Sequence, residues 1–166
     1  NKFQAGALVP ILKSEPIPET ASAVGEVVKV VGQTFDQLIL QSDKWVLLQI
    51  SAPWCGHCKL LDPIWEELVR ETRTMAFILA DELTSLLQQA KSRENDPRLT
   101  VATIDGTANE HLALKFVGFP SIQLWAPRTH DVTAYKSHRT LKDLNAFLDK
   151  VIGPLNLDEA ASKDEL

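Results

Sequence analysis

The sequence is poor in cysteine, methionine and tyrosine: its 166 residues include two cysteines, one methionine and one tyrosine. Two cysteines permit one internal disulfide, so a framework of several bridges is excluded. No apolar run approaches the roughly 20 residues that a membrane-spanning helix needs, so we expect no membrane insertion. No basic block occurs, and the net charge of −5 argues against nucleic-acid binding.

The composition is typical of one globular domain with tails, since 45% of the residues are hydrophobic and 23% are charged. The segment that begins at Pro10 is rich in proline and small polar residues, as an extended linker is. The last nine residues are strongly acidic. We therefore expect a linker and the remnant of a preceding domain over 1–24, a folded domain over 25–153, and an acidic tail over 154–166.

Hydrophobic patterning predicts an α/β domain in which strands and helices alternate before a final strand pair and a closing helix. This order predicts a central mixed sheet with helices on both faces. Thr34 and Thr140 are expected to N-cap two of the helices. The expected strands are 27–31, 45–50, 99–105, 121–125 and 131–135, and the expected helices follow Thr34 and cover 59–71, 109–116 and 141–152.

An extra inserted helix is predicted at about 74–98, where apolar residues recur at helical spacing opposite polar ones. Such an apolar stripe needs cover. We favour packing onto the domain's own surface, because a stripe of this kind is usually core. An exposed stripe would instead be a site for a partner or client.

Cys55 and Cys58 lie between a buried strand and the start of a helix, and three kinds of site have this pattern. As a structural staple the pair would contribute little, because it closes a very short loop. A zinc site usually needs four ligands, and His111, His130 and His138 lack partners at ligand spacing, so we expect no metal. The third kind is a reactive pair.

The start of a helix favours the thiolate of Cys55, because backbone N–H groups and the positive end of the helix dipole face its sulfur. Cys58 lies one turn further in and should be more buried, so Cys55 is expected to attack and Cys58 to resolve. A small or cationic dipeptide such as Gly56–His57 stabilises the reduced state and makes the disulfide more oxidising. Alternatively, His57 is only a solvated loop residue.

The segment "APWCGHC" (52–58), followed by Lys59 and Pro63, resembles the active-site segment of the protein disulfide isomerases. The similarity continues in "DGTAN" (105–109), "GFPS" (118–121) and the linker "LKSEPIPE" (12–19). The resemblance implies a thioredoxin-like fold and a C-terminal catalytic domain with its linker and tail. No cofactor is implied.

The resemblance also implies that Phe119–Pro120 is a cis peptide beside the disulfide, where backbone can pair with a substrate strand; the alternative is an ordinary trans proline that begins a strand. Trp54 and its apolar neighbours would contact unfolded polypeptide. An arginine from the loop before the last strand would stabilise the second thiolate, and Arg128 lies in that loop.

The sequence departs from the family at two positions. Where relatives carry a buried Glu beneath the second cysteine and a Lys on the next strand, this chain has Gln49 and Thr103. Losing both charges together is tolerable, because an unpaired buried charge would cost about 3–5 kcal/mol. Gln49 cannot accept a proton, so we hypothesise that mixed disulfides resolve more slowly near neutral pH than in relatives with the acid.

The last four residues, "KDEL", match a receptor-read retention address for the endoplasmic reticulum, although a chance acidic terminus is the alternative. Together these features predict a disulfide oxidoreductase and isomerase acting on cysteine-containing secretory polypeptides that are unfolded or misfolded. Glutathione or an oxidase would recycle the pair, and a retention receptor would bind the terminus. The alternative is a redox-inactive, client-binding chaperone module.

Overall fold

A computed structural model of the chain describes residues 11–19, 26–70 and 98–153. Almost all of the predicted inserted helix and the whole tail, including its last four residues, lie outside these ranges. None of the helices in the described ranges combines the length and the apolar composition that a membrane span requires.

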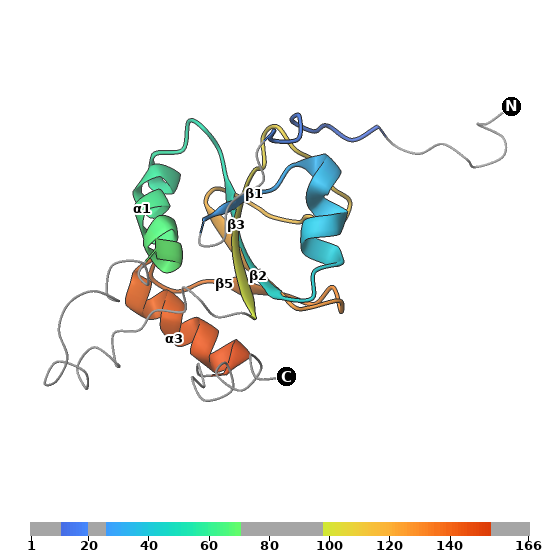
Figure 1. Cartoon of the computed structure of the whole chain (residues 1–166). Helices are drawn as coiled ribbons and strands as arrows, with labels where there is room; N and C mark the ends of the chain where they lie inside the picture. The colour runs from blue at the N-terminus through green and yellow to red at the C-terminus, as the bar shows by residue number, and fades with distance from the viewer. Residues whose placement is uncertain (1–10, 20–25, 71–97, 154–166) are drawn as a thin grey trace, which may run out of the picture.

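A five-stranded mixed sheet forms the centre of the domain, with strand order β1-β3-β2-β4-β5 (Figure 1). Strand β2 is central: it pairs in parallel with β3 and antiparallel with β4. This arrangement confirms the predicted mixed sheet. The strands are β1 (Val28–Lys29), β2 (Trp45–Ser51), β3 (Leu99–Asp105), β4 (Ser121–Trp125) and β5 (Val132–Tyr135).

Helices cover both faces of this sheet, as expected. Helices α1 (Gly56–Arg70) and α3 (Leu141–Ile152) lie on one face, and the 3-10 turn η1 (Gly32–Thr34) and the π-helical segment η2 (Asp36–Leu40) lie on the other. Successive residues of a strand face opposite sides. Leu47 of β2 therefore packs in the α1/α3 core, while Leu48 packs against Phe35 in the core of the other face.

The closing helix follows its predicted bounds because its ends are well capped. The Thr140 hydroxyl accepts a hydrogen bond from the Asp143 amide at 3.2 Å, which satisfies one of the first amides of the helix. Gly153 ends the helix with φ of +90°, a conformation that glycine adopts without steric cost.

Two predicted features of the other helices are wrong. Residues 109–116 form turns and irregular backbone instead of a helix, because distant segments bind their polar groups: the Glu110 amide donates to the Lys13 carbonyl and the Gln123 side chain to the Lys115 carbonyl. Thr34 does not cap a following helix. It ends η1, and its hydroxyl accepts from the Val31 amide at 3.1 Å.

The proline-rich segment is extended over 11–19, but it is bound to the domain. Lys13 and Glu15 hydrogen-bond the loop that follows β3, where the buried side chain of Asn109 bonds Glu15 through both its oxygen and its nitrogen. These contacts hold the segment against residues about 95 positions later in the sequence.

Candidate active site

The two cysteines lie at the junction between the end of β2 and the start of α1, and they form a disulfide. Cys55 immediately precedes the first residue of α1, and Cys58 lies in its first turn. Both are enclosed, with 6% of Cys55 and 2% of Cys58 exposed. The deeper position of Cys58 agrees with its expected resolving role.

The start of α1 points donors at Cys55. The Cys58 amide donates to Cys55 Sγ at 3.2 Å, and the Lys59 amide donates to the Cys55 carbonyl at 3.3 Å. A sulfur in this position, at the positive end of a 15-residue helix, is favoured as a thiolate when the pair is reduced. Gly56 and His57, the first two residues of α1, are both exposed.

The Phe119–Pro120 peptide bond is cis, as the family resemblance implies. Phe119 packs against the cluster formed by the two cysteines and Ala52, so this turn lies beside the disulfide. Trp54 is 72% exposed, and its ring meets that of Phe119 edge to face, with the ring centroids 5.6 Å apart. Through Phe119 and the exposed Trp54, the cysteine pair adjoins apolar surface open to solvent, and Val117, two residues before Phe119, is also fully exposed.

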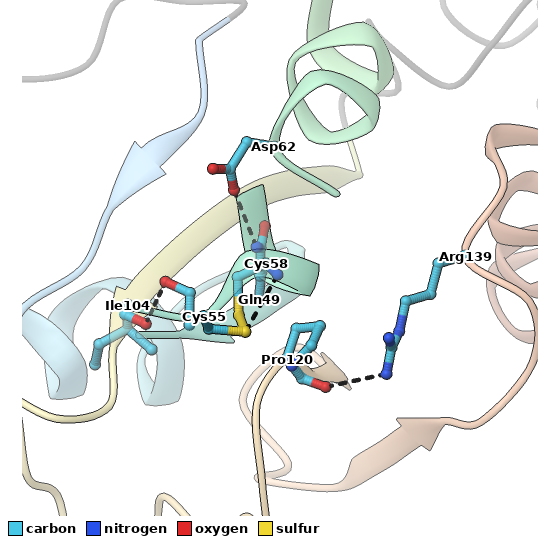
Figure 2. The surroundings of a disulfide bond; sticks show 8 residues. Gln49, Cys55, Cys58, Asp62, Ile104, Pro120 and Arg139 are labelled. Carbon is cyan, nitrogen blue, oxygen red and sulfur yellow. Dashed lines mark hydrogen bonds between the residues drawn. A yellow bond between two sulfur atoms is a disulfide. The ribbon is translucent and has the colours of Figure 1, made fainter. Parts of the chain in front are cut away.

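Gln49 and Thr103 face each other across β2 and β3, in the register expected of the two substituted positions. Gln49 is buried, with 1% of its surface exposed, and its Nε2 donates to Asp62 Oδ1 at 3.2 Å. Figure 2 shows the two side chains pointing toward each other beside the disulfide. Sequence reasoning missed Asp62, although its position four residues after Cys58 places both on one face of α1.

Comparison with known proteins agrees with this geometry. The thioredoxin family profile matches residues 26–91. A protein disulfide-isomerase of Humicola insolens is 37% identical over 89% of this chain and 25% of its own, and protein disulfide isomerase-like 1-3 of Arabidopsis thaliana is 36% identical over 98% of this chain and 24% of its own. The chain belongs to the protein disulfide isomerase family.

Solved structures agree with this assignment. The first thioredoxin domain of mouse protein disulfide-isomerase A4 superposes with a TM-score of 0.54 at 29% identity, covering 83% of this chain and 82% of that domain. The fold is therefore thioredoxin-like. The chain spans about a quarter of the length of the curated relatives it matches (24% and 25% for the two named above).

The prediction for Arg128 is wrong. Because β4 runs antiparallel to β2, the loop after β4 lies at the end of the sheet opposite Cys55. There the Arg128 guanidinium pairs with Asp43 in solvent and its amide donates to the Ser42 carbonyl. The arginine on the disulfide side is Arg139, whose guanidinium donates to the Pro120 carbonyl at 3.5 Å (Figure 2).

The pairing of the last two strands explains the position of Arg139. Strand β5 returns antiparallel to β4, which brings the residues after Tyr135 back beside Ile122 and the cis proline. Of the three histidines weighed as zinc ligands, His111 stacks on Phe35 with ring centroids 4.3 Å apart, and its Nε2 lies 3.0 Å from the Asp36 carboxylate. His130 and His138 are exposed.

Proposed function

We propose that this chain is a thiol–disulfide oxidoreductase and isomerase domain that forms, breaks and rearranges disulfides in secretory polypeptides. The observation that carries the proposal is the Cys55–Cys58 disulfide, which begins a helix and lies beside a cis proline. Family membership supports the same activity.

The oxidising reaction begins when a client thiolate attacks Cys55 Sγ. The Cys55–Cys58 bond breaks, Cys58 leaves with the electron pair, and a mixed disulfide forms. A second client thiolate then attacks the client sulfur of that bond and releases Cys55 as a thiolate, a good leaving group because the helix start stabilises it. The client gains a disulfide and the pair is reduced.

Reduced Cys55 performs isomerisation by attacking a wrong client disulfide, and Cys58 frees the client when rearrangement stalls. The apolar surface of Trp54 and Phe119 and the backbone before Pro120 would hold the client. The clients are cysteine-containing polypeptides, and glutathione or an oxidase recycles the pair. No metal or other cofactor enters these steps.

The proposal extends to organisation and location. Residues 1–24 are a linker and the remnant of a preceding domain, 25–153 the catalytic domain with its insertion, and 154–166 a tail whose last four residues address a retention receptor of the endoplasmic reticulum. Relatives named as protein disulfide isomerases support this location.

Reactivation of a reporter protein with scrambled disulfides tests the proposal. The wild-type chain should restore the reporter's activity, and Cys55→Ser or alkylation of Cys55 should abolish the gain. Cys58→Ser should accumulate mixed disulfides. Failure of the wild-type chain to react with any disulfide would contradict the proposal.

The alternative is a redox-inactive, client-binding chaperone module, favoured by the exposed side chains of Trp54 and Val117. The same preparations discriminate between the two functions. Under the alternative, alkylated protein would still suppress aggregation of a reduced client, and the wild type would show no gain in isomerisation over it.

A further inference from the structure

During the proposed exchange reaction, on which this inference rests, the thiol of Cys58 must give up its proton. To resolve a mixed disulfide at Cys55, Cys58 must act as a thiolate, because the thiolate is the nucleophile. Cys58 is only 2% exposed, so bulk water has poor access to its sulfur. Burial in apolar surroundings also disfavours the charged form of a thiol. A nearby proton acceptor would therefore accelerate resolution.

A cleft of about 170 Å³ adjoins Cys58 and contains the groups that can meet its proton. Its titratable lining side chains besides Cys58 are Lys59, Asp62 and Asp105. This volume has room for water molecules, and its polar lining offers them partners. A proton can thus leave Cys58 through the cleft without direct contact between donor and final acceptor.

Asp62 is the best placed of these groups. It lies four residues after Cys58 on α1, so the two side chains share one face of the helix. The buried amide of Gln49 donates to Asp62 Oδ1 at 3.2 Å and so holds the carboxylate toward the sheet, as Figure 2 shows. This bond engages one carboxylate oxygen and leaves the other to accept from water.

The other groups fit less well. Asp105 ends β3 and so does not share a helix face with Cys58, and its Oδ1 accepts from both the amide and the hydroxyl of Thr107, at 2.8 and 2.6 Å, which hold the carboxylate at the turn after β3. Lys59 and Gln49 do not fit the role, because an ammonium group offers only hydrogen-bond donors and a side-chain amide is not a base.

We propose that the Asp62 carboxylate accepts, through water in the cleft, the proton that Cys58 gives up when it resolves a mixed disulfide. Cys58 then attacks Cys55 Sγ and the Cys55–Cys58 bond forms. The bond from Cys55 to the client sulfur breaks, the client leaves as a thiolate with the electron pair, and it takes a proton from solvent. Asp62 later returns its proton to water.

The test follows one turnover of the reduced chain with glutathione disulfide, quenched with acid and analysed by intact mass. Formation of the Cys55–glutathione adduct reports the first attack, and its decay reports resolution by Cys58. Asp62→Asn is the main variant, because its amide oxygen still accepts from Gln49. Glu66→Gln is the matched control: it removes the same charge one turn further along α1, from a side chain that is exposed as Asp62 is but does not line the cleft.

Asp62→Asn should leave adduct formation unchanged and slow its decay by about tenfold or more at pH 7, since general acid–base groups contribute roughly 10²–10⁴. The deficit should shrink as the pH rises above about 8.5, the pKa of an ordinary thiol, and vanish only at the higher pH where the buried Cys58 ionises without an acceptor. Asp62→Glu should recover part of the rate, and Glu66→Gln should match the wild type at every pH.

Three results would overturn the inference: unchanged decay in Asp62→Asn, an equal loss in Glu66→Gln, or a loss in Asp105→Asn alone. Faster decay in Asp62→Asn would overturn it too, because it would mean that the carboxylate acts only by repelling the Cys58 thiolate. A wild type that forms no adduct at all would instead contradict the proposed function.

Discussion

Replacing Asn109 with alanine should destabilise the domain far more than one polar side chain usually does. Asn109 is 1% exposed and its amide group makes four hydrogen bonds. Oδ1 accepts from the amides of Glu15 and Gly32, both at 2.9 Å, and Nδ2 donates to Glu15 Oε2 at 2.8 Å and to the Asp105 carbonyl at 3.0 Å.

The magnitude follows from what each partner does once Asn109 is gone. A typical hydrogen bond contributes about 0.5–1.5 kcal/mol net, and a buried partner left unsatisfied costs more. Glu15 can hydrogen-bond water instead if the segment around it detaches. The Gly32 amide and the Asp105 carbonyl belong to the folded domain, so they would be left without a partner. We expect Asn109→Ala to lower the free energy of unfolding by about 3 kcal/mol.

Glu15→Ala provides the comparison. It removes one bond to Asn109 and a solvent-exposed ion pair with Lys29, so it should cost less than about 1.5 kcal/mol. Urea unfolding followed by tryptophan fluorescence measures both variants, and hydrogen exchange at the Gly32 amide should accelerate in Asn109→Ala alone. A loss below about 1 kcal/mol in Asn109→Ala would refute the reasoning.

Three further predictions concern the site and the core. Gln49→Glu combined with Thr103→Lys should speed resolution of mixed disulfides near neutral pH, measured by adduct decay; equal rates at all pH values would dismiss the hypothesis. Gly106→Ala should cost about 1–3 kcal/mol in urea unfolding and slow reporter reactivation, because its Cβ would lie 2.9 Å from the ring of Phe119; wild-type values for both would contradict this. Burial raises the pKa of Tyr135, so its contribution to stability should be present below about pH 10 and lost as pH rises further; Tyr135→Phe should flatten this alkaline loss, and an unchanged pH profile would argue against it.

Strands and the closing helix were predictable because local patterns and tertiary packing agree there. The apolar run of β2 is buried on both faces, and Thr140 and Gly153 mark both ends of α3. The helix prediction for 109–116 was wrong because local pattern and tertiary packing disagree there. Leu112 has helical spacing but is 64% exposed, while Asn109 is buried by bonds to a segment about 95 residues away.

In the active site too, some features could be predicted from the sequence and others could not. The cysteine pair, its helix and the cis proline could be predicted, because a short motif and a family resemblance carry them. Arg128 and Arg139 could not be assigned without knowing which end of the sheet each loop occupies. The contact between Gln49 and Asp62 joins a strand to a helix, and no local pattern in the sequence encodes it.

The most direct test of the account is the ionisation of Cys55 in the reduced chain. The rate of alkylation of Cys55 by iodoacetamide, followed against pH by mass spectrometry in Cys58→Ser, reports the thiolate fraction. We predict a midpoint at least about one unit below the pKa of 8.5 of an ordinary thiol, because the helix start stabilises the charge. A midpoint at or above 8.5 would contradict the proposal that Cys55 is the activated nucleophile.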